Sequence, residues 1–353
     1  MSPPLSRRAW SRATKPLQYL LSLGLMALFL YWAFRGIDSA SLITSLKSLS
    51  LGWAAAIVFT SLATLGLRSW RWLALMRPFT RGVSIWDASL ALAICYTSNV
   101  AIPRSGEAMR ALSLNWSRGA PVGAVLATVV VERILDLIWL VFLVVASLWL
   151  LPDTLEAAFP WLTALSLAAL AGCLAALVCL TLVSVYRDRA LLLVSRLFGR
   201  VWPKLAAKAT HLLETALHGL ASLHTPSAYL EIMLGSVLLN LGYLFIIYES
   251  FYAFGLDESY GLGLEAALVI LAISSIGVVL PTPGGAGSYH LFFSQSLHLL
   301  YGVAQAPALA CATGVHAIAT LTYVFLGGPA LFVQRLRYTR GKKNPAGPSA
   351  QVG

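Results

Sequence analysis

The sequence has few charged residues, and this scarcity excludes an ordinary soluble protein. Charged side chains make up 11% of its 353 residues and hydrophobic ones 58%, whereas a soluble protein of this size has about 25% charged residues. No segment long enough for a soluble catalytic domain is free of long apolar runs. The composition therefore predicts a polytopic integral membrane protein.

Cysteine is also scarce, and its placement excludes two further classes of site. The four cysteines lie inside apolar runs, at Cys95, Cys173, Cys179 and Cys311. None belongs to a C-x-x-C pair, so neither a disulfide framework nor a metal site is indicated. The sequence also lacks an H-E-x-x-H motif and a nucleotide-binding glycine loop, so we expect no metal, no cofactor and no direct hydrolysis of ATP.

The net charge of +11 would by itself fit a nucleic-acid-binding protein. The basic residues, however, sit in short stretches that flank apolar segments, as in the cytoplasmic loops of membrane proteins. We therefore predict no nucleic-acid partner. We expect a multi-pass protein of the cell inner (plasma) membrane with both termini in the cytoplasm.

Charged stretches predict on which side of the membrane each connection lies. Basic stretches indicate the cytoplasm, and acidic ones here mark the outer side. The inner stretches are 1–16, 68–81, 187–224 and 335–343, and the outer ones lie near 152–158 and 255–265. The predicted organisation is a basic N-terminus (1–16), one transmembrane domain (17–333) and a basic, partly disordered tail (334–353). Within the domain, the amphipathic segment 187–224 is expected to lie on the cytoplasmic surface.

Two apolar segments do not fit as full crossings. Between the inner stretch ending at 81 and the outer stretch at 152 the number of crossings must be odd, yet two apolar segments, 86–102 and 122–151, lie between them. The simplest solution makes 86–120 re-entrant from the cytoplasm, and the same argument makes 264–302 re-entrant from outside. The predicted fold is all-α, with about six full spans and two re-entrant helical hairpins.

The two hairpins break at similar sequences. Val-Ala-Ile-Pro103-Arg-Ser-Gly106 resembles Val-Val-Leu-Pro281-Thr-Pro-Gly284. Broken segments in corresponding positions of two oppositely oriented halves are typical of inverted-repeat transporters, whose binding site lies where the breaks meet. The halves would be about 17–160 and 161–333.

Charged residues at the first break and in the following apolar run are the main candidates for a binding site. Charge in a membrane segment is costly and usually functional. If a helix restarts at the break, Arg104, Glu107 and Arg110 would share one face of it. We hypothesise that the arginines bind a lipid phosphate in a midplane cavity, and that the carboxylates hold the arginines or contact a cationic headgroup. The alternative is a structural ion-pair network. These candidates are Arg104, Glu107, Arg110, Glu132, Arg133 and Asp136.

Three further elements have two interpretations each. Arg68-Ser-Trp-Arg71-Trp72 is either an interfacial belt with snorkelling arginines or a contact for lipid phosphate. The glycines 284, 285 and 287 either offer bare N–H groups to phosphate or only allow a tight turn. His290 is either a gate or proton carrier or an ordinary histidine. As candidate lipid contacts we retain Arg68, Arg71, Gly284, Gly285, Gly287 and His290.

Taken together, these motifs resemble the lysylphosphatidylglycerol synthase transmembrane family, a flippase-like family. Four of its motifs are matched, by Arg68-x-x-Arg71-Trp72, Pro103-Arg104-x-Gly106-Glu107-x-x-Arg110, Glu132-Arg133-x-x-Asp136 and Pro281-x-Pro283-Gly284-Gly285-x-Gly287. The family usually has a glutamate three residues after the last glycine, where this chain has His290. We expect a stand-alone member without the aminoacyl-transferase domain of the full synthases.

The resemblance implies movement of lipid between leaflets. We therefore expect a translocase for an anionic or aminoacylated phospholipid, or another lipid phosphate, rather than an enzyme. The alternatives are an integral-membrane enzyme acting on a polyprenyl-phosphate or glycolipid substrate, and a lipid-binding partner of a separate enzyme. The sequence also leaves open whether the chain forms a homo-oligomer.

Overall fold

The structure is a computed structural model that describes residues 6–77, 80, 82–186, 189, 192 and 226–343. Helices joined by short turns make up this part of the chain, and no strand occurs in it, which confirms the all-α prediction. The expected amphipathic segment 187–224 lies outside the described residues except at positions 189 and 192. Residues 344–353 of the expected tail also lie outside them, whereas residues 334–343 continue the last helix.

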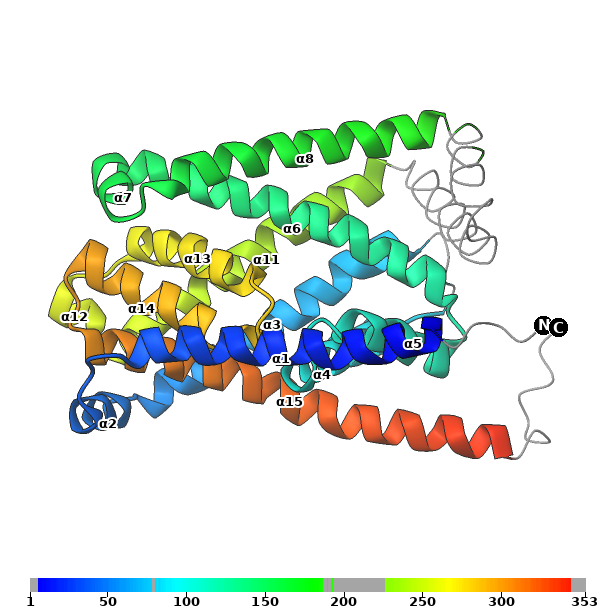
Figure 1. The fold of residues 1–353 in the computed structure, drawn as a ribbon, viewed down its shortest axis with the longest axis horizontal. Helices are drawn as coiled ribbons and strands as arrows, with labels where there is room; N and C mark the ends of the chain where they lie inside the picture. The colour runs from blue at the N-terminus through cyan, green and yellow to red at the C-terminus, as the bar shows by residue number, and fades with distance from the viewer. Residues whose placement is uncertain are drawn as a thin grey trace.

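Six helices of 25 residues or more run along the long axis of the described part (Figure 1). A helix of 25 residues is about 37 Å long, and the hydrocarbon core of a bilayer is about 30 Å thick. These helices are α1 (Ser6–Phe34), α3 (Leu51–Met76), α6 (Val122–Leu150), α8 (Trp161–Val185), α11 (Pro226–Ala253) and α15 (Gln305–Lys343).

Length and apolar composition together identify three of these helices, α3, α11 and α15, as able to cross a membrane. The number becomes four if α1 and the short helix α2 (Ser39–Lys47), which is bent from it by 90°, form one span. The chain is therefore a membrane protein, and the number of six full spans stays a prediction.

The short connecting elements separate into two ends of the molecule. Helices α2, α7 (Pro152–Ala158) and α12 (Leu256–Tyr260) lie at one end, and the start of α1 and the end of α15 lie at the other (Figure 1). We call the first the acidic end, because its connections hold Asp38, Asp153, Glu156, Asp257, Glu258 and Glu265. We call the other the terminal end. Where the structure describes them, the segments that the charge pattern assigns to opposite sides of the membrane thus lie at opposite ends of the molecule.

Two helical hairpins approach each other from opposite ends (Figure 1). The first consists of α4 (Ile85–Ala101) and α5 (Gly106–Arg118). The second consists of α13 (Leu264–Val279), the 3-10 turn η1 (Pro283–Gly285) and α14 (Ser288–Tyr301). Their tips touch, because the Arg104 Nη2 donates to the Val279 carbonyl at 3.2 Å. The two breaks therefore meet, as the repeated halves predict.

Small residues allow the helices around these hairpins to pack closely. Helix α15 crosses α4 at Gly327, where an added Cβ would overlap the Ala93 carbonyl oxygen. The same holds within the first hairpin, where a Cβ on Gly106 would overlap the Cys95 carbonyl oxygen. Close backbone approach at small residues is a main source of helix association in membranes.

The neighbouring glycines of α15 provide a matched test of this packing. Replacing Gly327 with alanine should lower the free energy of unfolding by about 1–3 kcal/mol, because the site has no room for a methyl group. Gly328→Ala should not lower the free energy of unfolding, since no atom of a neighbouring element lies within 4 Å of the Cβ position. Thermal unfolding of both variants in detergent would measure this, and equal midpoints for the two would contradict the packing.

Candidate functional site

Arg68 and Arg71 lie inside the protein rather than at its membrane interface. Arg71 is fully buried and Arg68 is 7% exposed, so the interpretation as a snorkelling interfacial belt is wrong. The reason is that α3 does not end near these arginines but continues to Met76. The end of α3 is marked instead by the exposed Arg77, which pairs with Glu231 at 2.7 Å.

Buried and partly buried side chains from three helices form a compact group of charges. We call it the charge cluster, and it comprises Arg68 and Arg71 from α3, Arg110 from α5, and Glu132 and Asp136 from α6. Glu132 and Asp136 are four residues apart and therefore lie on one face of α6. The structure brings them together with the arginines of two different sequence motifs.

Glu132 is the centre of the charge cluster. Its side chain is fully buried and contacts all three arginines. One oxygen lies 2.6 Å from the Arg110 Nη1, and the other lies 3.5 Å from the Arg71 Nη2 and 3.6 Å from the Arg68 Nε. A single buried carboxylate therefore connects α3, α5 and α6.

Asp136 forms the side of the cluster that approaches the surface. Its oxygens lie 2.7 Å from the Arg71 Nη2 and 3.1 Å from the Arg68 Nη2. Arg133 lies at the rim, 3.7 Å from Asp136, with 52% of its side chain exposed against 29% for the aspartate. The cluster is thus closed around Glu132 and open around Arg133.

The charges of the cluster do not balance. Three buried arginines face two carboxylates, which leaves a charge of 3 − 2 = +1, and adding Arg133 with Glu107 leaves the same excess. Among the described residues, the Nε atoms of Arg68, Arg71 and Arg110 and the Nη2 of Arg110 have no hydrogen-bond partner. Unused guanidinium donors beside an excess positive charge are suited to a phosphate or another anion.

Aromatic side chains surround the arginines, and two of them were not identified from the sequence. The Arg110 guanidinium lies 4.7 Å from the centre of the Trp72 ring. Arg68 donates to the hydroxyls of Tyr96 and Tyr243 at 3.1 and 3.2 Å. Trp72 is part of the first arginine motif, but the two tyrosines are isolated in apolar runs, and only their hydroxyls in a membrane segment could have drawn attention to them.

The first hairpin tip places its charges differently from the prediction. Arg104 is exposed and adopts a left-handed φ of 58°. Glu107 is half-buried, and its Oε2 has no hydrogen-bond partner among the described residues. Arg110 is fully buried. The expected common face of these three residues is wrong, because α5 begins at Gly106 and leaves Arg104 in the turn.

The glycines of the second tip form a tight turn. Gly284, Gly285 and Gly287 have φ values of 58°, 79° and 86°, which favour glycine. The N–H of Gly285 donates to the Thr282 carbonyl at 3.2 Å, and the N–H of Gly287 donates to the Nδ1 of His290 at 3.3 Å. These two N–H groups are therefore already used within the turn.

His290 is buried at this tip beside a second histidine that the sequence did not single out. The ring of His316, from α15, lies 4.9 Å from that of His290. The His316 Nε2 is 3.0 Å from the Gly284 carbonyl oxygen. Gly284 thus lies against Val100 of the first hairpin, Gly287 lies against α1, and His290 faces His316 of α15.

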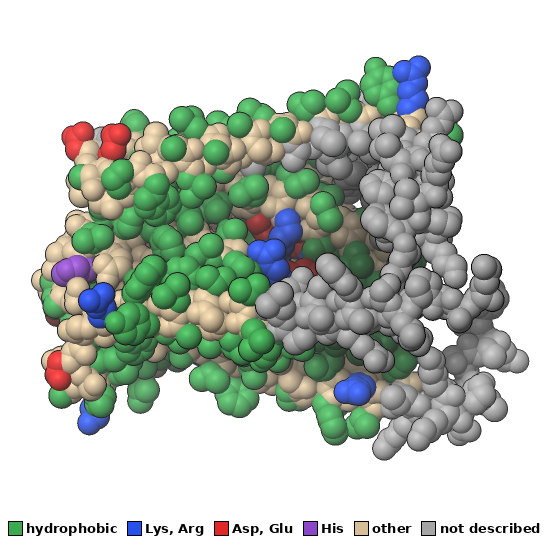
Figure 2. Space-filling model, in the orientation of Figure 1, with side chains coloured by type: hydrophobic (Ala, Val, Ile, Leu, Met, Phe, Trp, Pro, Cys, Tyr) green, Lys and Arg blue, Asp and Glu red, His purple; other side chains and the backbone are tan. Residues whose placement is uncertain are grey.

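Charged side chains reach the molecular surface midway along its length. Figure 2 shows basic and acidic side chains together in a recess that is bordered by hydrophobic ones. The partly exposed Arg133 and Asp136 come from the middle of α6. A charged recess at this level of a membrane protein would open toward lipid.

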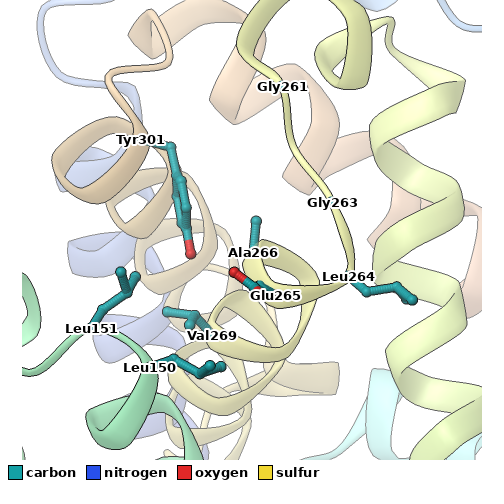
Figure 3. A pocket seen from close by; sticks show the side chains of 9 residues that line it. All are labelled: Leu150, Leu151, Gly261, Gly263, Leu264, Glu265, Ala266, Val269 and Tyr301. Carbon is teal, nitrogen blue, oxygen red and sulfur yellow. The ribbon is translucent and has the colours of Figure 1, made fainter.

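A cavity of about 430 Å³ lies elsewhere, at the acidic end (Figure 3). Its polar side chains are Glu265 and Tyr301, and Leu150 and Leu151 line it from the end of α6. Leu150 follows Glu132 by 18 residues, which corresponds to about 27 Å along the helix. The cavity is therefore separate from the charge cluster.

Nothing in the described part of the chain resembles a metal centre, since no three of its His, Cys, Asp or Glu residues are grouped to hold an ion. Cys95 and Cys311 are free and buried. The side chains of Cys173 and Cys179 lie outside the description.

Comparison with known proteins gives one result. No curated protein and no solved structure matches the chain. The family described as the lysylphosphatidylglycerol synthase TM region matches residues 19–327. This range includes the charge cluster and both hairpins, so the chain belongs to the lysylphosphatidylglycerol synthase TM region family.

Proposed function

We propose that the protein is a lipid translocase that moves an anionic or aminoacylated phospholipid, or another lipid phosphate, between the two leaflets. Membership of its family supports a role in lipid handling. A headgroup that crosses a bilayer needs a polar path, because the hydrocarbon core excludes charge. The charge cluster and its recess are the polar features that would provide this path.

The excess positive charge of the cluster carries the proposal. A purely structural network would be more stable with balanced charges, because a buried charge without a partner is costly. Here the unused guanidinium donors belong to Arg68, Arg71 and Arg110. Arg133, at the exposed rim, would receive a phosphate first, and the buried arginines would then hold it.

The two hairpin tips would control passage past the cluster. The exposed Arg104 is bonded to a backbone carbonyl of the other hairpin. In the proposed mechanism its guanidinium exchanges the Val279 carbonyl for the lipid phosphate, and the tips separate as the headgroup passes. Arginine suits this exchange because its donors bind carbonyl and phosphate oxygens in similar geometry.

Enzymatic use of the same carboxylates is the weaker alternative. A general acid or base must be free to exchange a proton with its substrate. Glu132 and Asp136 are instead each contacted by at least two arginines, which favours the ionised, engaged form of both carboxylates.

We also propose that the protein lies in the cell inner (plasma) membrane and that its terminal end faces the cytoplasm. Fusing green fluorescent protein to the C-terminus should give a fluorescent protein, and alkaline phosphatase at the same position should be inactive. Alkaline phosphatase inserted between Pro152 and Ala158, at the acidic end, should be active. The reverse pattern would refute this orientation, which rests on the positive-inside rule.

Arg104 allows a test of translocation itself. In vesicles with fluorescent phosphatidylglycerol, Arg104→Ala should slow the exchange of lipid between leaflets by about tenfold, since one charge-assisted hydrogen bond is lost. The control is Arg118→Ala, which removes an exposed arginine paired with Asp87 at the end of α5. If the wild type and Arg104→Ala both match protein-free vesicles, the protein is not a translocase.

Arg133 and Glu132 allow function to be separated from stability. Arg133→Gln should slow lipid exchange and leave the unfolding midpoint unchanged, because the side chain is half-exposed and weakly paired. Glu132→Gln should lower stability by about 3–5 kcal/mol, since three buried arginines lose their common partner. Exchange rates and thermal unfolding would be measured for both variants. A full exchange rate in Arg133→Gln would show that the rim arginine does not contact lipid.

A further inference from the structure

A carboxylate in α11 has no cationic partner in the described part of the chain and takes no part in the proposed function. Glu249 lies in one of the helices that qualify as membrane spans. The Thr60 hydroxyl on α3 donates to its Oε1 at 2.7 Å, whereas its Oε2 is buried without a hydrogen-bond partner among the described residues. No ion pair within that part of the chain includes Glu249. An acidic residue of this kind in a span needs a partner.

Aromatic rings occupy the same contact between α3 and α11, one or two turns nearer to the acidic end. The rings of Trp53 and Tyr252 have centres 4.8 Å apart, and Tyr248 contacts Tyr252 with its ring and its hydroxyl. Trp53 and Thr60 are seven residues apart, and Tyr252 and Glu249 are three apart. Each pair therefore lies on one face of its helix, and Trp53 is 39% exposed.

The electrostatic environment favours a cation at this position. The connections of the acidic end contain six carboxylates against Arg35 and Lys47, which gives a charge of 2 − 6 = −4. Such an excess raises the local concentration of positive ligands. Aromatic faces beside a carboxylate form the arrangement that binds ammonium groups.

We infer that Trp53, Thr60, Glu249 and Tyr252 form a binding site for an organic ammonium group, which we call the ammonium site. The ammonium would be carried by a lipid headgroup or by a free amine, and either would supply the partner that the Glu249 Oε2 lacks. The inference requires only that this end of the protein is accessible to amines, and it does not depend on translocation.

The ammonium site and the charge cluster would act separately. Thr60 and Arg68 are eight residues apart, or about 12 Å along α3. The polar side chains of Ser61 and Thr64 lie between them on the buried part of the helix. The two sites thus differ in ligand charge and in position along the same helix.

Native mass spectrometry of the full chain in detergent would test the site. Phosphatidylethanolamine should bind the wild type, and Glu249→Gln should weaken this binding by about tenfold because a charged partner is lost. Phosphatidylglycerol, which lacks an amine, should bind both proteins equally. Glu258→Gln is the matched control, because it removes an exposed carboxylate at the same end.

Competition distinguishes the two sources of the ammonium group. Displacement of phosphatidylethanolamine by millimolar ethanolamine would show that a free amine suffices, and its absence would identify a lipid-bound ligand; both results support the site. Trp53→Leu provides a second variant if Glu249→Gln does not fold, and it should also weaken binding of phosphatidylethanolamine. The site is refuted if these variants bind both lipids like the wild type, or if Glu258→Gln has the same effect as Glu249→Gln.

Discussion

The contact of one buried glutamate with three arginines is the interaction on which the centre of the molecule depends. Glu132 joins α3, α5 and α6 in a place where water cannot replace a lost partner. This contact fixes the position of the first hairpin, since Arg110 belongs to α5. The imbalance of charge that remains after these pairings has no structural use in the described chain, and it is the basis of the proposed affinity for lipid phosphate.

The sequence predicted those features that follow from hydrophobic length and charge sign. The bounds of α4 and α6 agree with the predicted apolar runs to within one residue. The parity of crossings predicted two hairpins, and the similar sequences of their breaks predicted that the breaks meet. One of the two interpretations placed Arg68 and Arg71 at the interface, because a basic pair near the end of an apolar run usually lies there. Only the three-dimensional pairing with α6 shows that they are buried.

Other parts of the candidate site could not be predicted, because they depend on register or on single residues. The shared face expected for Arg104 and Arg110 required knowledge of where α5 begins, which Gly106 determines through its contact with Cys95. Tyr96, Tyr243 and His316 are single polar residues in apolar runs and form no pattern. Glu249 is likewise a single polar residue in an apolar run. Only the structure distinguishes it, through the missing partner of its Oε2.

Helix α15 contacts both hairpins within one short stretch. His316 contacts the glycine turn of the second hairpin, and Gly327 packs against α4 of the first. These positions are eleven residues, or about 16 Å, apart, and Pro329, which weakens the helix, comes after both of them. The two hairpins are therefore attached to one continuous stretch of α15, so a shift of this stretch acts on both hairpins at once.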